Sequence, residues 1–206
     1  MPLTRLPLTS SALTGTLPVA SGGTGVTTST ALANTGNMVL LSTTTPTAVR
    51  DIDISIASGY DNYLIVGRGI DINTSANEID LYFTSDNFST TDSAVKVERR
   101  YNRLDTSGTG TNIFSGYCRL SENQGVDATD SMSFELTLFG ATISSRSVGY
   151  SFVGHSLYGH TDDTHHYRYD WGGRSQTTSV IDGFRLRTNS GTTFVATGSV
   201  KLYGLR

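Results

Sequence analysis

Cysteine, lysine and charge are scarce in this chain of 206 residues, and each scarcity excludes a class of protein. The single cysteine, Cys118, cannot form an intrachain disulfide or build a cysteine-ligated zinc site, so we expect a small buried hydrophobe. Charged residues make up 16% of the chain, against roughly 25% in an average soluble domain. The net charge is −3, so the basic surplus typical of nucleic-acid binding is missing, and nucleic acid is not an expected partner.

Long hydrophobic runs are missing as well. The longest wholly aliphatic run covers residues 38–41, far below the roughly 18 apolar residues of a membrane-spanning helix. The first 20 residues do not show the charged-then-apolar order of a secretory signal. We therefore expect neither membrane insertion nor a signal peptide. The sequence also lacks a fixed repeat of roughly 20 to 50 residues, which argues against a solenoid or a propeller.

Serine, threonine and glycine are abundant instead, with 25, 31 and 22 residues, a composition typical of β-rich proteins. From residue 37 onward, short runs alternate between apolar and polar residues. The clearest run covers residues 131–139, where Phe134, Leu136 and Leu138 share one face. Because helix periodicity is nowhere sustained, the sequence predicts an all-β fold, an antiparallel and jelly-roll-like β-sandwich. The expected strands cover residues 51–56, 63–70, 78–84, 95–104, 113–120, 131–139, 148–157, 165–171, 180–188 and 193–203.

Turn residues separate these runs. Asn189, Ser190 and Gly191 stand between the last two expected strands and predict a tight hairpin that joins them. The Gly-Xaa-Gly triplets at residues 23–25 and 67–69 lack the third glycine of a nucleotide-binding loop. They therefore predict turns or strand irregularities.

The first 36 residues have a different texture. Their only charge is Arg5, and prolines and glycines interrupt them. They contain too few large apolar residues for a core of their own, yet leucine and valine recur along them. The sequence thus predicts two parts: an extended N-terminal arm, residues 1–36, which orders when packed on another subunit, and a sandwich domain, residues 37–206. A flexible tail is the alternative for the arm.

Two segments carry a family resemblance. Residues 13–25 read LTGTLPVASGGTG and resemble a segment that recurs in bacteriophage tail-fibre and related virion fibre proteins. The runs at residues 60–63, 80–86, 181–186 and 198–205 resemble the C-terminal β-sandwich of phage virion proteins. The resemblance touches both ends of the chain and about half of its length.

This resemblance implies a homotrimeric, non-enzymatic appendage on the exterior of the phage particle. Its N-terminal segment would dock to other virion proteins, and its sandwich would face outward with a site for a host receptor. Because only 36 residues precede the sandwich, a short fibre, a fibre-tip protein and a capsid-attached fibre remain equally consistent. The docking residues implied by the motif are Leu13, Leu17, Pro18, Val19, Gly22, Gly23 and Gly25.

All four histidines fall between residues 155 and 166, beside Asp162 and Asp163. Imidazole and carboxylate groups can bind a transition metal, which makes His155, His160 and His165 weak candidate ligands. No pair has the helical spacing of a known zinc motif, so we expect a polar surface loop, no metal and no cofactor.

The expected strand at residues 165–171 presents two different faces. Alternation places Tyr167, Tyr169 and Trp171 on one face and His166, Arg168 and Asp170 on the other. Aromatic rings beside hydrogen-bonding groups are the usual means of holding a sugar, so all six are candidate receptor-binding residues. Because large aromatic residues are more often buried, we expect the tyrosine face in the core and the His166 face accessible.

Three further patterns bear on enzyme function. The adjacent acids Asp162 and Asp163 point apart on a strand, whereas glycoside hydrolysis needs two acids that converge. Residues 154–158 lack the final glycine of the serine-hydrolase elbow. We therefore expect no enzymatic activity. The basic stretch Lys96, Glu98, Arg99, Arg100 and Arg103 suits a solvated or intersubunit strand.

The sequence-based hypothesis is a virion structural protein, a short fibre or spike subunit. It docks through residues 1–36 and displays its sandwich to host cell-surface polysaccharide. Three alternatives stay open: a non-adhesive capsid or tail decoration protein, a carbohydrate-binding module, and, less favoured, a polysaccharide-degrading spike. An open-edged sandwich and an arm without a core both favour self-association as a homotrimer.

Overall fold

The computed structural model describes residues 37–56, 59–104, 108–126, 130–142, 149–160, 165–175, 179–189 and 191–206. The predicted arm, residues 1–36, lies outside these ranges, together with its docking residues. The chain divides into two units, Met1–Val39 and Leu40–Arg206. Of the first unit, residues 37–39 are described, and the second unit holds the sandwich.

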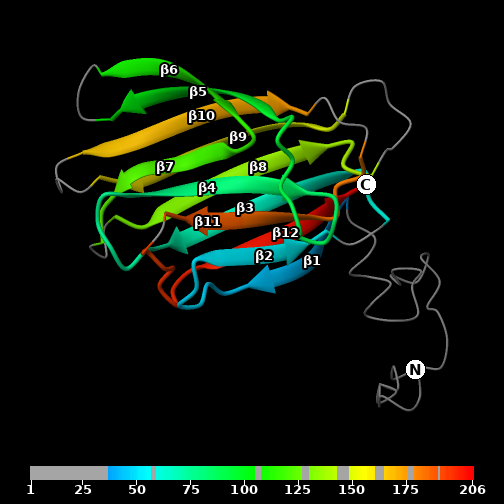
Figure 1. Ribbon diagram of the computed structural model, residues 1–206, viewed down its shortest axis with the longest axis horizontal. Coiled ribbons are helices and arrows are strands. Elements are labelled where there is room, and N and C mark those ends of the chain that lie inside the picture. The colour runs from blue at the N-terminus through cyan, green and yellow to red at the C-terminus, as the bar shows by residue number, and fades with distance from the viewer. Residues whose placement is uncertain are drawn as a thin grey trace, which may run out of the picture. The chain divides into compact units, whose positions relative to one another are not determined.

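The described residues form twelve β-strands in two sheets (Figure 1). The larger sheet has the order β1-β12-β3-β8-β9-β10-β5-β6, and the smaller has the order β2-β11-β4-β7. Their bounds are β1 (Met38–Thr44), β2 (Asp51–Ser55), β3 (Asn62–Ile70), β4 (Asn77–Thr84), β5 (Lys96–Arg103), β6 (Thr109–Ser115), β7 (Cys118–Gln124), β8 (Met132–Phe139), β9 (Ser151–Gly159), β10 (His166–Arg174), β11 (Gly183–Thr188) and β12 (Ser199–Leu205).

The strand order is that of a jelly roll with an insertion, so the predicted fold class is confirmed. Successive strands from β2 to β5 alternate between the two sheets, as do β6, β7 and β8. The larger sheet would read β3-β8-β5-β6 without the hairpin of β9 and β10, which stands between β8 and β5. In a jelly roll two Greek keys form two facing sheets, and here β1 and β12 extend the larger sheet beside β3.

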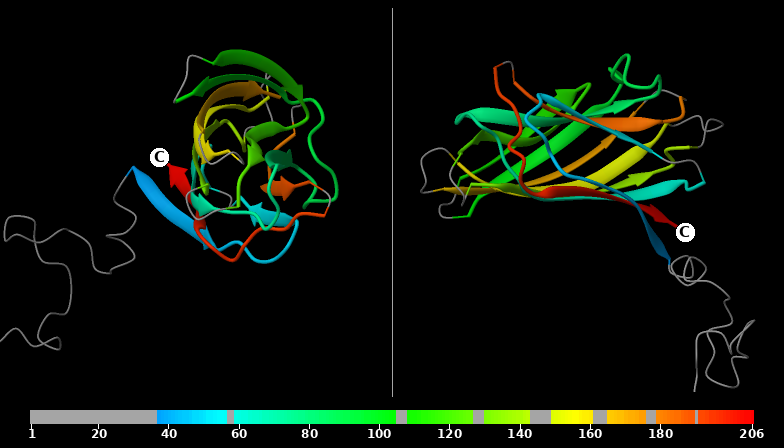
Figure 2. Two further views of the ribbon diagram at one scale, coloured as in Figure 1. Left: turned by 90° about the vertical axis from the view of Figure 1, so that its left-hand side faces the viewer. Right: turned by 90° about the horizontal axis from the view of Figure 1, so that it is seen from below.

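The core lies between the two sheets, which Figure 2 shows facing one another. On β8 the inward residues Met132, Phe134, Leu136 and Leu138 are buried, as the alternation predicts. Burial of each such side chain contributes about 1.5–3 kcal/mol. Cys118 is buried as well, and burial raises the pKa of its thiol well above the usual value. The prediction that Cys118 is a small buried hydrophobe is confirmed.

Two local predictions are wrong. The run at residues 113–120 is not one strand, because Gly116, with φ +86°, turns the chain between β6 and β7. The expected hairpin at residues 189–191 does not form, since β11 and β12 belong to different sheets. Turn residues indicate that the chain reverses, but they do not determine whether the next strand pairs with the last one. In addition, the sequence did not predict the strand β1. The predicted irregularity at residues 67–69 is confirmed, because the register of β3 shifts between Gly67 and Ile70.

Glycines on the inner face of the larger sheet make room for aromatic rings near the site described below. A Cβ on Gly154 would lie 2.4 Å from the Trp171 ring, and a Cβ on Gly110 would lie 2.3 Å from the Tyr101 ring. Only a residue without a side chain allows this close approach. These two glycines therefore set where the rings of the neighbouring strands can lie.

Candidate functional site

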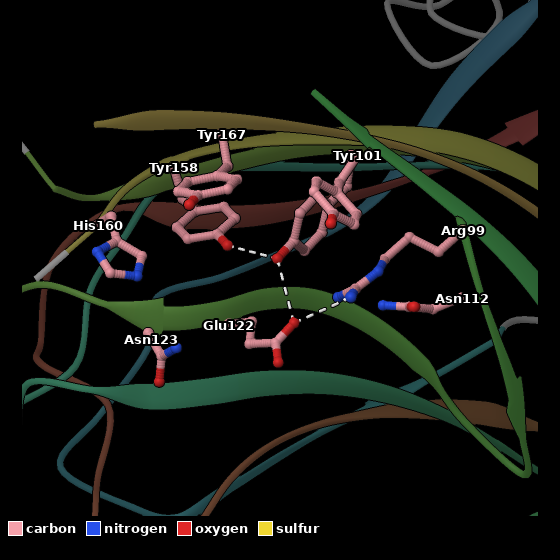
Figure 3. Close-up of a pocket in the computed structure, with 9 residues that line it drawn as sticks. Arg99, Tyr101, Asn112, Glu122, Asn123, Tyr158, His160 and Tyr167 are labelled. Atoms are coloured by element: carbon pink, nitrogen blue, oxygen red, sulfur yellow. Dashed lines mark hydrogen bonds and ion pairs between the residues drawn. The ribbon is translucent and has the colours of Figure 1, made fainter. Parts of the chain in front are cut away.

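A pocket of about 260 Å³ opens where the inner faces of β5, β6, β9 and β10 meet β7 (Figure 3). The inner residues of the larger sheet are aliphatic and phenyl side chains over much of its area, but they become tyrosine, arginine and asparagine here. The pocket is lined by Arg99, Tyr101, Asn112, Glu122, Asn123, Tyr158, His160, Tyr167 and Tyr169.

Strand register gathers the tyrosines. Tyr169 on β10 stands opposite Tyr101 on β5, and Tyr167 stands opposite Tyr158 on β9. Because side chains alternate between the faces of a strand, Tyr167 and Tyr169 share the inner face. Four tyrosines from three neighbouring strands thus point into one end of the sandwich.

Arg99 is the charged centre of the pocket, although its side chain is only 1% exposed. Its Nη2 donates to Oε2 of Glu122 at 2.9 Å. With the Asn112 amide turned so that both of its groups are satisfied, its oxygen accepts a second bond from Nη2 at 2.6 Å. The guanidinium lies 4.1 Å from the ring centre of Tyr169 and 4.8 Å from that of Phe114. Its Nε and Nη1 are buried and have no hydrogen-bond partner among the described residues.

A chain of hydroxyl groups ends on the same carboxylate. Tyr169 donates to Oε2 of Glu122 at 3.5 Å, and the hydroxyl oxygens of Tyr158 and Tyr169 are 2.5 Å apart. Since Tyr169 donates to Glu122, we assign the proton between the two tyrosines to Tyr158. Burial raises the pKa of Tyr169 to about 12 and also raises the pKa of Tyr158. Both hydroxyls therefore stay protonated at neutral pH and hold the two rings in place.

The walls of the pocket are aromatic. Figure 3 shows the rings of Tyr158 and Tyr167 one above the other. They stack at an interplanar angle of 14°, with their centres 5.7 Å apart. The ring centre of His160 lies 5.3 Å from that of Tyr167, and the ring centre of Tyr101 lies 6.5 Å from that of Tyr167. Of the four tyrosines, Tyr167 and Tyr101 are only partly buried, so theirs are the tyrosine rings that a bound molecule can reach.

Glu122 is the carboxylate that a ligand can reach. Its side chain is 38% exposed, in contrast to that of its partner Arg99. Both of its side-chain hydrogen bonds fall on Oε2, which leaves Oε1 available to accept further bonds. The exposed amides of Asn112 and Asn123 add donors and acceptors beside it.

The structure separates the six predicted receptor residues as expected. Tyr169 and Trp171 are buried and Tyr167 is half-buried, which confirms the inward face. His166 and Arg168 are exposed on the other face, with Asp170 partly exposed. Of the six residues, Tyr167 and Tyr169 line the pocket.

The three weak metal candidates do not come together. His155 is exposed on the outer face of β9, whereas His160 lines the pocket. The backbone nitrogen of His160 donates to the carbonyl oxygen of His165 at 2.9 Å. Within the described ranges, no three His, Cys, Asp or Glu side chains gather closely enough to hold a metal ion.

Sequence reasoning missed most of the pocket. The basic stretch around Arg99 was expected to form a solvated or intersubunit strand. Lys96, Glu98 and Arg100 are exposed on β5, but a solvated side chain is wrong for Arg99, because it faces inward. The signal was present: the buried Val95 and Val97 share a face with Arg99 and Tyr101. Glu122 and Asn123 carried no local signal, since they lie in the part of β7 beyond residue 120, where no strand was expected.

A second polar cluster lies on the outer face of the smaller sheet, and we call it the ion-pair ladder. Arg119 on β7 binds Asp80 and Glu78 on β4. Arg185 and Arg187 on β11 bind aspartates on β2 through Nε and Nη2. Arg185 binds Asp53 in this way, and Arg187 binds Asp51. The ladder consists of Asp51, Asp53, Glu78, Asp80, Arg119, Arg185 and Arg187. Every guanidinium nitrogen of Arg119 is bonded to a carboxylate, and Arg185 and Arg187 each bind an aspartate through Nε and Nη2, so we assign the ladder to stabilising the sheet.

No family model, curated protein or solved structure matches this chain. The part of the chain that the structure describes contains no helix of sufficient length and apolarity to cross a membrane.

Proposed function

We propose that this protein is a non-enzymatic bacteriophage virion subunit, a short fibre or spike, that attaches to host cell-surface glycan through its tyrosine-lined pocket. The observation that carries the proposal is the convergence of two reachable tyrosine rings with Glu122, Asn112 and Asn123. Ligand sites combine apolar and aromatic walls with a few placed polar groups. A sugar ring has the matching surfaces, an apolar C–H face and a rim of hydroxyls.

The composition of the pocket favours binding over hydrolysis. Of the described residues that line it, Glu122 alone carries a carboxylate. Glycosidases generally need two carboxyl groups, one on each side of the scissile bond. In addition, Glu122 is tied to Arg99 and Tyr169 through Oε2. Such a carboxylate is suited to orient a hydroxyl group rather than to transfer a proton.

The virion setting is supported by the fibre-like motif at residues 13–25 and by the jelly roll, an architecture that viral capsid proteins use. Assembly as a homotrimer is part of the proposal. The edge strand β6 lacks the charges and prolines that usually protect an open sheet edge, and its Ile113 is 79% exposed. Light scattering of the full chain should give three times the mass of one subunit, and a stable monomer would contradict this part.

The pocket is tested by comparing the two faces of β10 in the full chain. Tyr167→Ala should weaken binding to host cells and to a glycan array about tenfold or more, which corresponds to roughly 1.4 kcal/mol. The control is a triple alanine variant at His166, Arg168 and Asp170, which should bind as the wild type does. Melting curves of both variants establish that they are folded.

Three outcomes would contradict the proposal in different ways. Unchanged adsorption by folded Tyr167→Ala would remove the pocket as the attachment site. Loss of adsorption only in the triple variant would move the site to the outer face. If neither variant changes adsorption and no glycan binds, non-adhesive particle decoration is the better account.

A further inference from the structure

The charges that a ligand can reach differ from the charges that the pocket contains. Arg99 is the lining residue with a permanent positive charge, but its side chain is 1% exposed. Nη2 is fully used by Glu122 and Asn112, while Nε and Nη1 are buried. A bound molecule therefore cannot form a bidentate pair with this guanidinium.

The negative charge of the same ion pair stays accessible. Glu122 is 38% exposed, and its Oε1 is open to a ligand. A carboxylate only accepts hydrogen bonds, so it selects donors such as sugar hydroxyls. An acidic sugar would place a second carboxylate against Glu122, and like charges in contact are strongly unfavourable.

A cationic ligand is disfavoured for another reason. Ammonium groups are recognised by aromatic faces, but the face of Tyr169 and that of Phe114 already hold the guanidinium of Arg99. At these two rings the protein's own cation fills the position that a ligand cation would need, and the guanidinium of Arg103 lies over the ring of Tyr167. It also neutralises part of the charge of Glu122.

From these contacts we infer that the pocket takes a neutral, hydroxyl-rich sugar and discriminates against acidic sugars; this rests on the proposed glycan-binding function. Hydroxyl groups donate to Oε1 of Glu122, and the amides of Asn112 and Asn123 both donate and accept. The partly exposed rings of Tyr101 and Tyr167 contact the C–H face of the sugar. A site built to bind hydroxyl groups discriminates strongly against analogues that lack them.

Two other groups need control in the test. Arg103 lies over the Tyr167 ring, with its guanidinium carbon 5.7 Å from the ring centre, and it could attract an acid to the rim. His160 also lines the pocket with its imidazole ring. The measurement is therefore made at pH 8, where histidines as a class are mostly neutral, and Arg103→Gln is included.

The experiment compares oligosaccharides in matched pairs that differ only by a hexose or the corresponding hexuronic acid. They are presented to the full chain on an array and then titrated by calorimetry. We expect the neutral member of a bound pair to bind about tenfold or more tightly than the acidic one. The double variant Arg99→Met with Glu122→Gln removes both charges together and should narrow this difference several-fold. The Tyr167→Ala substitution should weaken the binding of both the neutral and the acidic oligosaccharide.

The outcomes separate the two proposals. If the acidic member binds equally well or better and Tyr167→Ala abolishes that binding, the neutral-sugar inference is overturned while the glycan-binding function stands. Loss of acid binding in Arg103→Gln would then identify the rim as the cause. If no member binds in a way that depends on Tyr167, the proposed function itself fails.

Discussion

Two arginines contact the ring of Phe114, and they hold their charges in opposite ways. Arg119 donates from Nε and Nη2 to Asp80 at 3.0 and 3.4 Å, and from Nη1 to Glu78 at 2.6 Å. Arg99 uses Nη2 alone, although its side chain is less exposed than that of Arg119. Their guanidinium carbons lie 5.6 and 4.8 Å from the Phe114 ring centre, respectively.

The difference lies in the partners. Around Arg119 the carboxylates are largely buried, every guanidinium nitrogen is bonded, and no capacity is left for a ligand. Around Arg99 the counter-ion reaches solvent and keeps one oxygen open. The comparison distinguishes an arginine whose carboxylate partners are largely buried from one that lines a pocket beside an accessible counter-ion.

The largest expected effect comes from Arg119→Met. The substitution leaves Asp80 buried without its cation, and breaking a buried pair in this way costs about 3–5 kcal/mol. Denaturant unfolding at pH 7 measures the change in free energy. Arg185→Met is the matched control, because Asp53 is 37% exposed and can be hydrated, so a much smaller loss is expected. Equal losses in the two variants would contradict the role of burial.

The next effect concerns pH. Burial raises the pKa of Asp80 to about 6 despite the bonds from Arg119. Burial lowers the pKa of Arg119, but Asp80 and Glu78 raise it by more. Asp80 is the more buried partner, so burial disfavours its charged form by more than the pair with Arg119 favours it.

The folded state therefore keeps a proton on Asp80 that the unfolded chain loses above pH 4. Stability contributed by this group is present below that pH and is lost as the pH rises through about 6. The loss is roughly 3 kcal/mol, from about 1.4 kcal/mol per pKa unit. Unfolding of the wild type and Asp80→Asn at pH 4 to 7 measures it, because the variant lacks the titration. A wild type that gains stability relative to the variant over this window would show that Arg119 holds Asp80 ionised.

Arg99→Met should have a smaller effect on stability. Glu122 becomes unpaired but can be hydrated, and methionine fills much of the space between Tyr169 and Phe114. We expect a change within about 1.5 kcal/mol, as for other volume-conserving replacements, together with weaker oligosaccharide binding. Thermal unfolding and calorimetric titration of one preparation measure both. A loss as large as that of Arg119→Met would remove the distinction between the two arginines.

The smallest effect is expected on the outer face of the larger sheet. Arg168 and Asp170 form an ion pair at 2.8 Å, with side chains 54% and 41% exposed. Exposed pairs contribute about 0–1 kcal/mol, so Arg168→Ala should barely change the unfolding midpoint. A shift that exceeds that of Arg99→Met would show that this surface is part of a tighter network.

Much of the fold could be predicted, because alternation reports directly which face of a strand is buried. The inward face of β8 and the division of β10 between Tyr169 and Arg168 both followed from a period of two. The pocket was harder to predict. Tyr167 and Tyr169 were named as candidates. Arg99 was assigned to a solvated or intersubunit strand, because its basic stretch is interleaved with Glu98 and Tyr101, and its inward register was overlooked.

By itself the sequence determined the all-β class, the sandwich, the buried Cys118 and the faces of most strands, since these depend on local alternation and composition. Only the tertiary structure decided which strands are neighbours. It placed β9 and β10 between β8 and β5, and it separated β11 from β12. Glu122 meets Arg99 because β7 of the smaller sheet packs against β9, β10 and β6 of the larger sheet, the last two of which flank β5. Contacts of this kind depend on long-range pairing, which alternation along a single strand does not encode.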